Sequence, residues 1–429
     1  MVLARLEARR MVSAVAAREA FEAASNSLLK APRPGAYLGF DPTADGLHIG
    51  HLAGVMALRQ LQSAGFQAIA LVGGATGLIG DPSGRITERE LLDQDKVAQN
   101  VLGLKRDLGH VLDFEGGRTK LVNNLDWYES MSAIGLLRDV GKHFRVGTMM
   151  TRESVKSRLG GEDGGLSLTE FAYQALQGYD FLHLYRTSNC KVQVGGSDQW
   201  GNIVGGLDLI RRVTRANDVS GLAVPLLTTK AGQKLGKSAG NAVWLSPDKT
   251  SDYEFYQYLY RVEDEDVEDL LLRLTEVDVE EIEATLKEHR TAPHQRKAQK
   301  LLAEQVTQIV RGSENVIRAQ RATQVLFGKS IDQVSASDLA AIGHSGDAPT
   351  ASFKKAEVEG LPIIELALRT GACASKSEAR RLVKSNGLYL NNRRVEDENQ
   401  KFDVSLDTLE GRVALLRTGK RNYVILEIV

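Results

Sequence analysis

Two histidines three residues apart, His48 and His51, form a pair whose spacing predicts chemistry. Apolar residues recur at helical spacing after them until Gly65, so both rings are predicted on one face of a first helical turn. The free N–H groups and partial positive charge of a helix N-terminus favour phosphate binding. Gly50 leaves room for a flat ring against the backbone. A metal pair or a helix-capping pair is the alternative, but no carboxylate or cysteine follows at metal-ligand spacing.

A glycine-rich segment over residues 73–84 follows a nearly continuous apolar stretch, 67–72. Its glycine spacing matches neither a P-loop nor the dinucleotide-binding fingerprint. The glycines therefore fit either a plain turn or a close approach of the backbone to a ligand. Arg85 and Arg89 follow directly, and either reach a phosphate or lie on a solvated surface.

Three polar residues, Tyr173, Gln177 and Asp180, recur at i, i+4 and i+7 along a predicted helix. Ser167 and Glu170 form a capping box that starts this helix, and the spacing places the three side chains on one face. A polar stripe on a helix is often just its solvated side. Tyr, Gln and Asp are not the usual mixture of Lys and Glu, however, so they favour a binding face.

Two further loops follow predicted strands and could contact a nucleotide. Gly196 and Asp198 follow the strand 191–194, and open α/β sheets bind ribose at the carboxyl ends of their strands. Asp198 could instead cap the next helix. The loop 230–241 is rich in Gly and Lys, so its lysines could close on a phosphate chain, unless it is an exposed basic loop without function.

These residues require a framework of alternating strands and helices. Strands are predicted over 36–40, 67–72, 191–194 and 223–227, with helices between them. This pattern predicts an α/β fold with a Rossmann-like parallel sheet. Residues 120–165 interrupt the alternation, and we interpret them as an insertion that forms a dimer contact.

The composition is that of an ordinary globular protein of two or three domains, with 429 residues, 42% hydrophobic and 25% charged. A net charge of −1 gives no global sign of nucleic-acid binding, so any basic surface must be local. Two distant cysteines fit a reducing compartment and argue against zinc, and no apolar run could span a membrane. Residues 1–30 contain arginines, which fit an import signal, and glutamates, which fit an amphipathic surface helix.

Taken together, these segments resemble the class I aminoacyl-tRNA synthetases, and specifically the tyrosyl-tRNA synthetases. Residues 48–51 match the HIGH signature fully, and Lys234, Lys237 and Ser238 occupy the fixed places of the KMSKS signature. The resemblance covers nearly the whole chain. Other segments typical of tyrosyl enzymes are 39–45, 71–84 and 195–202.

The resemblance implies a tyrosine–tRNA ligase. Such an enzyme activates L-tyrosine with ATP to tyrosyl-adenylate, releases pyrophosphate, and passes tyrosine to the 3′-terminal ribose of tRNA(Tyr). The resemblance further implies Mg²⁺ accompanying ATP, no protein-bound metal site, a homodimer and no membrane contact. An RNA-binding or splicing protein on a retained synthetase fold is the alternative. The related tryptophanyl enzyme conflicts with the pair of Tyr37 and Asp180.

The resemblance also implies roles for single residues. Those assigned to tyrosine are Tyr37 and Asp180 at the phenolic hydroxyl, Asp81, Tyr173 and Gln177 at the ammonium group, and Gln199 at the carboxylate. Those assigned to ATP are Thr43, His48, His51, Asp41 and Gly50, with Gly196 and Asp198 at the ribose. Those assigned to the pyrophosphate are Lys234, Lys237 and Ser238, while Arg85 and Arg89 stand where the family has mobile basic groups.

The part of the chain after the predicted catalytic domain, 1–245, is expected to bind RNA. Residues 246–345 have a helical pattern, which the resemblance assigns to the anticodon arm, and residues 346–360 are predicted as a linker. Residues 361–429 form a modestly basic α+β unit similar to an RNA-binding fold first seen in a small-subunit ribosomal protein (S-four-like). Its candidate RNA-binding residues are Lys376, Arg380, Arg381, Lys384, Arg393 and Lys420.

The predicted compartment rests on small differences within the family. Leu38 stands where bacterial members more often have a small polar residue that contacts ribose, and residues 144–148 and 234–245 are closer to mitochondrial members. The chain begins about where a bacterial enzyme begins, so the expected presequence is very short, trimmed or absent. The prediction is the mitochondrial matrix, with the bacterial cytoplasm as the alternative.

Overall fold

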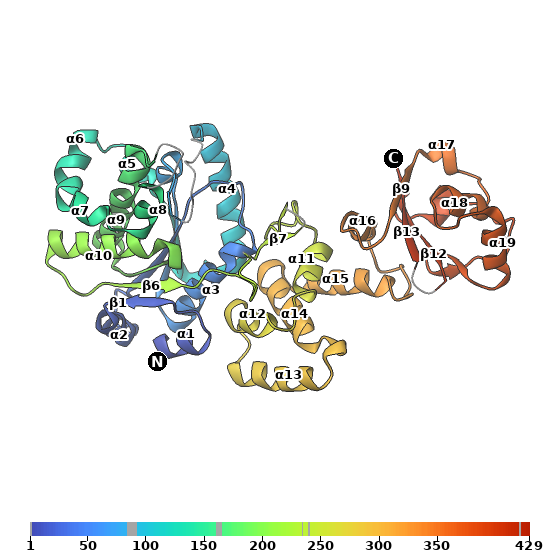
Figure 1. Ribbon diagram of the computed structural model, residues 1–429, viewed down its shortest axis with the longest axis horizontal. Helices are drawn as coiled ribbons and strands as arrows, with labels where there is room; N and C mark the ends of the chain where they lie inside the picture. Colours follow the sequence, from blue (N-terminus) through green and yellow to red (C-terminus); the bar gives the residue numbers. More distant parts are fainter. Residues whose placement is uncertain (1, 84–91, 160–164, 234, 239–240, 420–421) are drawn as a thin grey trace. The chain divides into compact units, whose positions relative to one another are not determined.

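The computed structural model describes residues 2–83, 92–159, 165–233, 235–238, 241–419 and 422–429. They form two compact units, whose elements are labelled in Figure 1. The first unit contains the chain up to Ser246 together with Val262–Gln305, and the second contains Pro247–Arg261 together with Val306–Val429. Over these ranges, no helix is both long and apolar enough to cross a membrane.

A six-stranded sheet is the centre of the first unit, which confirms the predicted Rossmann-like α/β fold. Its spatial order is β1-β6-β5-β2-β3-β4, with all neighbours parallel except β1, which pairs antiparallel with β6. Successive residues of β3 are buried, and because successive side chains point to opposite faces, both faces must be covered. The strands are β1 (Ala14–Ala16), β2 (Gly35–Phe40), β3 (Gln67–Val72), β4 (Thr119–Asn123), β5 (Cys190–Gly196) and β6 (Ser220–Val224).

The strand predicted over 223–227 is β6, and it ends earlier than predicted. Pro225 follows its last residue and has no N–H group with which to continue the ladder. Residues 2–26 contain α1 (Val2–Ala8), β1 and α2 (Arg18–Asn26), and they pack into this unit through buried side chains such as Leu6 and Phe21.

Helices of the first unit start and stop where the sequence signals predict. α3 begins after His48 and ends before Gly65, whose φ of 113° lies in the left-handed region that glycine tolerates. α9 begins after Ser167, whose hydroxyl accepts the N–H of Glu170 at 3.2 Å. The helices around the sheet are α1 (Val2–Ala8), α2 (Arg18–Asn26), α3 (Ile49–Ala64), α4 (Gln94–Val111), α9 (Leu168–Ser188) and α10 (Trp200–Thr214).

Short segments interrupt the alternation of strands and helices. The predicted insertion contains α5 (Leu125–Tyr128), α6 (Ala133–Gly135), η3 (Leu136–Val140), η4 (Gly141–His143), α7 (Val146–Met149) and α8 (Glu153–Leu159). Single turns lie elsewhere: η1 (Thr76–Leu78), η2 (Glu115–Gly117), η5 (Ser197–Gln199) and η6 (Pro293–Gln295). The remaining elements are the hairpin of β7 (Lys237–Ser238) and β8 (Asn241–Ala242), and the helices α12 (Val267–Leu274), α13 (Val279–Thr291) and α14 (Lys297–Arg311), the last of which ends in the second unit.

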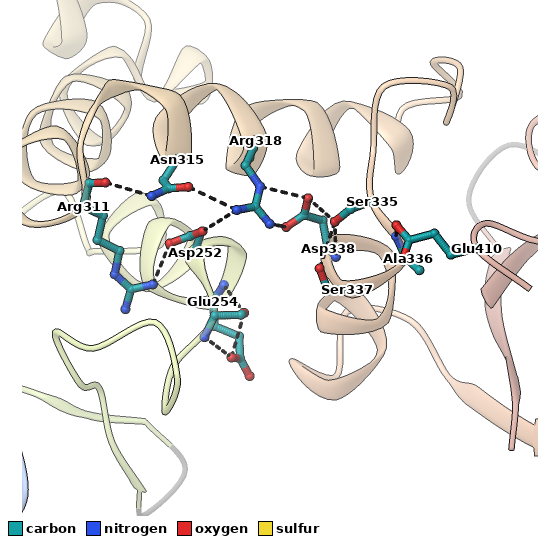
Figure 2. A network of polar contacts seen from close by, with 11 residues as sticks. Asp252, Glu254, Arg311, Asn315, Arg318, Ser335, Ala336, Ser337, Asp338 and Glu410 are labelled. Carbon is teal, nitrogen blue, oxygen red and sulfur yellow. Dashed lines mark hydrogen bonds and ion pairs between the residues drawn. The ribbon is translucent and has the colours of Figure 1, made fainter. Parts of the chain in front are cut away.

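An ion-pair network joins the helices of the second unit (Figure 2). Asp252, in the first turn of α11 (Asp252–Tyr260), lies 2.9 Å from Arg311 and 3.5 Å from Arg318. Arg318 belongs to α15 (Ser313–Val325) and also pairs at 2.9 Å with Asp338 of α16 (Ala336–His344). One arginine therefore connects three helices.

A five-stranded sheet, in the order β11-β10-β12-β13-β9, completes the second unit. β9 lies within the segment 346–360, predicted as a linker, and pairs in parallel with β13. The strands are β9 (Thr350–Phe353), β10 (Leu388–Leu390), β11 (Arg393–Arg394), β12 (Val413–Thr418) and β13 (Asn422–Ile428). The helices beside them are α17 (Lys355–Val358), α18 (Ile363–Arg369), α19 (Lys376–Lys384) and α20 (Val404–Asp407). Leu366, Phe402 and Leu416 are among the residues of their common core.

Candidate active site

A cavity of about 400 Å³ opens in the first unit at the carboxyl ends of β2, β5 and β6. The start of α3 and one face of α9 complete its wall. Ligands of open α/β sheets bind at this edge. All residues predicted to bind tyrosine or ATP line it: Tyr37, Asp41, Thr43, His48, Gly50, His51, Asp81, Tyr173, Gln177, Asp180, Gly196, Asp198 and Gln199.

The histidine pair caps the helix that it starts. Nδ1 of His48 accepts the N–H of Gly50 at 3.0 Å, and Nδ1 of His51 accepts the N–H of His48 at 3.2 Å. Desolvation and the neighbouring His48 lower the pKa of His51 to about 3, so this ring is neutral. Because Nδ1 accepts in both rings, the proton of each imidazole lies on Nε2, and the Nε2–H of the neutral His51 can donate to a ligand.

Gly50 is required by the packing of the histidine itself. A Cβ atom at this position would lie 2.7 Å from Cε1 of His48 and 3.4 Å from the carbonyl oxygen of Leu235. The sequence predicted room for a flat ring beside Gly50, and in the structure the ring of His48 lies there.

Tyr37 and Asp180 lie at the buried end of the cavity, and each is 2% exposed. The Tyr37 hydroxyl has no hydrogen-bond partner among the described residues. Burial and the neighbouring Asp180 raise the pKa of Tyr37 well above its usual value, so the hydroxyl keeps its proton. A buried hydroxyl without a partner is unfavourable unless a ligand supplies one.

Two residues that the sequence reasoning missed hold Asp180. Nε1 of Trp127 donates to its Oδ1 at 3.0 Å, and Nδ2 of Asn124 donates to its Oδ2 at 3.1 Å. Burial raises the pKa of Asp180 to about 7, although these bonds and Tyr128 act in the opposite direction. The position of Asn124 directly after β4 was the available signal, because the carboxyl ends of parallel strands meet at one edge.

A second polar cluster lies around Asp81. Nε2 of Gln199 donates to Asp81 at 2.7 Å, and the backbone N–H of Ser83 donates to its other oxygen at 2.9 Å. Nδ2 of Asn202 donates to Oε1 of Gln177 at 2.8 Å and to Oε1 of Gln199 at 3.2 Å. Carboxylate and amide oxygens therefore gather here, which suits a cationic group of a ligand.

Asp41 joins the glycine-rich segment to α9. Its carboxylate accepts a hydrogen bond from the Tyr173 hydroxyl at 2.8 Å and another from Thr76 at 2.7 Å. A Cβ atom on Gly73 would lie 2.3 Å from this carboxylate. Gly73 is thus required by its close packing against protein side chains. The choice between a plain turn and a close approach to a ligand stays open.

The backbone of the lysine loop lies against the start of α3. Ile49 donates its N–H to the carbonyl oxygen of Val243 at 3.0 Å, and His48 forms a β-bridge with Trp244. A Cβ atom on Gly236 would come within 2.9 Å of the Gly50 nitrogen. Predicted residues that lie outside the described part of the chain, wholly or in their side chains, are Arg85, Arg89, Lys234, Lys237 and Ser238.

No group of His, Cys, Asp and Glu in the described ranges has an arrangement that could hold a metal ion.

In the second unit, α19 is amphipathic, with Ala379 and Val383 buried. Its four predicted RNA-binding residues, Lys376, Arg380, Arg381 and Lys384, are exposed. Of the predicted set, Lys376 pairs with Glu365 at 2.5 Å, Arg380 with Glu398 at 3.8 Å and Arg393 with Asp332 at 2.8 Å, while Lys420 lies outside the described residues.

Sequence profiles of two known protein groups match this chain. The sequence profile of the tRNA synthetases class I (W and Y) matches residues 30–328. The profile of the tyrosine–tRNA ligase SYY-like C-terminal domain matches residues 343–426. The first match contains the residues that line the cavity, and the second contains α19.

Individual proteins are similar over most of the chain. The tyrosine–tRNA ligase of Rhodopirellula baltica is 48% identical over 91% of this chain and 89% of its own length. That of Geobacillus stearothermophilus is 44% identical over 93% of this chain and 94% of its own. Among solved structures, a C-terminally truncated mitochondrial tyrosyl-tRNA synthetase of Coccidioides posadasii is 35% identical, with a TM-score of 0.64, and the match covers 74% of this chain and 90% of that one.

Proposed function

The chain belongs to the tyrosine–tRNA ligases, a family of class I aminoacyl-tRNA synthetases, and from this premise we propose how its residues activate tyrosine. The observation that carries the proposal is the unpaired hydroxyl of Tyr37 beside the buried Asp180. Nothing in the comparisons favours the alternative of an RNA-binding or splicing protein on a retained synthetase fold.

Tyr37 and Asp180 bind the phenolic hydroxyl of tyrosine. The substrate hydroxyl donates to the Asp180 carboxylate, which keeps acceptor capacity beyond its bonds to Trp127 and Asn124. It accepts in turn from the Tyr37 hydroxyl. The first bond uses the remaining acceptor capacity of Asp180, and the second gives the buried Tyr37 hydroxyl the partner that the described residues do not supply.

The ammonium group of tyrosine binds near Asp81, Tyr173 and Gln177, which provide oxygen acceptors on one side of the cavity. Gln199, whose amide lies 2.7 Å from Asp81, is then positioned to approach the tyrosine carboxylate. Fixing both ends of the amino acid aims the carboxylate at ATP.

ATP binds across the start of α3, with the ribose at Gly196 and Asp198 and with Asp41, Thr43 and Gly50 beside it. A carboxylate oxygen of tyrosine attacks the α-phosphorus in line, and pyrophosphate leaves. Negative charge then builds on the leaving phosphates. The Nε2–H groups of His48 and His51 are donors that can stabilise this charge without a general base.

The remaining phosphate contacts come from the lysine loop and the loop after the glycine-rich segment. ATP enters as its Mg²⁺ complex. In the second step, the terminal ribose hydroxyl of tRNA attacks the acyl carbon of the adenylate, and AMP leaves. The residues proposed to bind the pyrophosphate are Lys234, Lys237, Ser238, Arg85 and Arg89.

The partners are tRNA(Tyr) and a second copy of the chain. The exposed cations of α19 support tRNA binding by residues 361–429, and the helical residues 246–345 face the anticodon arm. The insertion exposes large apolar side chains, which supports a homodimer contact there: Ile134 is 72% exposed, Leu137 66% and Val146 60%. The proposed domain limits are 1–245, 246–345 and 361–429, with 346–360 between the last two, and β9 of that segment joins the sheet of residues 361–429.

The mitochondrial matrix is the proposed compartment, with the bacterial cytoplasm as the alternative. Its support is the similarity to the mitochondrial tyrosyl-tRNA synthetase of Coccidioides posadasii, whereas the tyrosine–tRNA ligase of Rhodopirellula baltica has the higher sequence identity. Imaging a fluorescent fusion of the full chain in the source cells would distinguish the two. Fluorescence outside mitochondria would contradict the proposal.

Tyrosine-dependent exchange between ATP and radiolabelled pyrophosphate tests the proposed reaction. Each of the twenty amino acids is offered in turn to the full chain. We expect exchange with tyrosine and background rates with the others. Equal exchange with tryptophan, or none with any amino acid, would contradict the proposal.

A further inference from the structure

A second hollow lies at the opposite edge of the first unit's sheet, at the amino ends of β2 to β5. Its volume is about 650 Å³, and it shares no lining residue with the cavity described above. Four segments far apart in the sequence line it, because parallel strands that start at one edge bring together their first residues and the chain just before them. They are residues 32–33, 66–67, 116–120 and 186–189.

Four cationic side chains from three of these segments line the hollow: Arg33, Arg118, Lys120 and Arg186. No Asp or Glu is among its lining residues. Arg118 pairs with Asp113 at 3.0 Å, whereas the structure shows no ion pair for the other three within the described residues. Gathered like charges repel one another, so this arrangement favours an anion that would neutralise them.

Hydrogen bonds within the protein hold these segments together. Nδ2 of Asn189 donates to the carbonyl oxygens of Pro32 at 3.0 Å and Arg33 at 3.2 Å. Nε2 of Gln67 donates to the carbonyl oxygen of Gly117 at 3.2 Å. The backbone that carries the cations is therefore already in place, which reduces the entropy that binding must overcome.

We infer that this hollow, the amino-end basic pocket, binds a small polyphosphate, either inorganic or as the tail of a nucleotide. Guanidinium groups match phosphate oxygens in a bidentate geometry, and Lys120 adds a compact charge. A volume of about 650 Å³ exceeds what a single phosphate needs. Single-stranded RNA would be expected to use exposed aromatic rings for stacking, and the one aromatic side chain here, Phe66, is only 2% exposed.

Calorimetric titration of the full chain tests this inference, with sodium tripolyphosphate and ATP as separate probes. Since the active site also binds phosphates, the wild type should show two sites for at least one probe. Lys120→Gln and Arg186→Gln should each weaken the second site by about tenfold or more. The rate of pyrophosphate exchange should stay the same, because neither residue lines the catalytic cavity.

Lys287→Gln is the matched control, because Lys287 is an exposed lysine of α13 in the same unit. It should leave both sites unchanged. If Lys120→Gln and Arg186→Gln weaken the second site for both tripolyphosphate and ATP, the pocket binds a polyphosphate in either form. If they weaken it for one probe alone, the pocket binds that form. A single site in the wild type, or equal weakening in Lys287→Gln, would overturn the inference. Binding of single-stranded RNA there, without polyphosphate, would overturn it too.

Discussion

Two buried aspartates, one in each unit, differ in how the protein compensates their charge. Asp252 is 7% exposed and lies between two arginines (Figure 2). The guanidinium of Arg311 also lies over the ring of Phe255, 4.4 Å from its centroid. Asp180 is 2% exposed and accepts hydrogen bonds from the neutral donors Trp127 and Asn124. Over the described residues, no ion pair reaches Asp180.

The different partners of the two carboxylates indicate that Asp252 stabilises the fold, whereas Asp180 serves ligand binding. A buried carboxylate that is fully paired by cations fixes the packing of helices, and removing it leaves buried charge behind. A buried carboxylate with only neutral donors keeps its proton more readily and keeps acceptor capacity for a ligand. The unpaired hydroxyl of Tyr37 beside Asp180 marks that site as incomplete without substrate.

The largest expected effect is on stability, from Asp252→Asn. This change removes the carboxylate that lies 2.9 Å from the buried guanidinium of Arg311, so the second unit should lose about 3–5 kcal/mol of unfolding free energy in urea. Asp208→Asn, which removes an exposed pair with Arg211, is the matched control and should change stability by less than about 1 kcal/mol. Pyrophosphate exchange by the folded enzyme should not change. Equal unfolding free energies for Asp252→Asn and Asp208→Asn would contradict a structural role of the buried ion pair.

Asp180→Asn should affect catalysis instead. The variant keeps the shape of the side chain but loses a charged acceptor for the phenol, so kcat/KM for tyrosine in pyrophosphate exchange should fall by about 100-fold. Its unfolding free energy at neutral pH should not fall. A loss of stability as large as that of Asp252→Asn would show that Asp180 is structural.

The pH dependence of stability sharpens the same comparison. The pKa of Asp180 is raised from 3.8 to about 7, so the folded protein binds this proton more tightly than the unfolded chain does. Its contribution to wild-type stability therefore decreases as pH rises from about 4 to about 7, by at most about 1.4 kcal/mol per pH unit, and is constant above. Asp180→Asn lacks this dependence.

The stability difference, variant minus wild type, should accordingly grow over that range and then level off. His51 acts in the opposite sense, because its lowered pKa costs stability as pH falls below 6.5, but it is common to both proteins and cancels. Urea unfolding at several pH values measures the difference. A difference that is independent of pH would contradict the raised pKa.

Trp127→Phe should have the smallest effect. It removes one neutral donor from Asp180, while an aromatic ring can still stack on His183. We expect kcat/KM for tyrosine to fall by about fivefold, which corresponds to one hydrogen bond of about 1 kcal/mol. A fall as large as that of Asp180→Asn would mean that Trp127 contacts the substrate or supports the whole site.

The sequence predicted those site residues that carry a local pattern. The capping of α9 and the spacing of Tyr173, Gln177 and Asp180 place three polar groups on one helix face, and the structure has them in one cavity. The start of α3 at His48 was predicted in the same way. Such patterns depend only on helical geometry, which a sequence shows directly.

Contacts between distant segments could not be predicted in this way. Asn124 and Trp127 belong to a segment interpreted as the start of an insertion, and their bonds to Asp180 exist only after β4 has joined the sheet. β9 lies within a predicted linker, and it is recognised by its pairing with β13, some 75 residues later. In both cases the role of a segment depends on a contact with a segment far away in the sequence, which a local pattern does not show.

The central claim is that Tyr37 and Asp180 recognise the substrate hydroxyl. Selection of tyrosine over phenylalanine through such bonds is already known for tyrosyl-tRNA synthetases as a class, so our claim concerns only which residues of this chain supply them. The most direct measurement is kcat/KM in pyrophosphate exchange for tyrosine and phenylalanine, in the wild type, Tyr37→Phe and Asp180→Asn. We expect the ratio of kcat/KM for tyrosine to that for phenylalanine to fall by about tenfold in Tyr37→Phe and by more in Asp180→Asn, with little change in kcat/KM for phenylalanine. An unchanged ratio in both variants would contradict this claim.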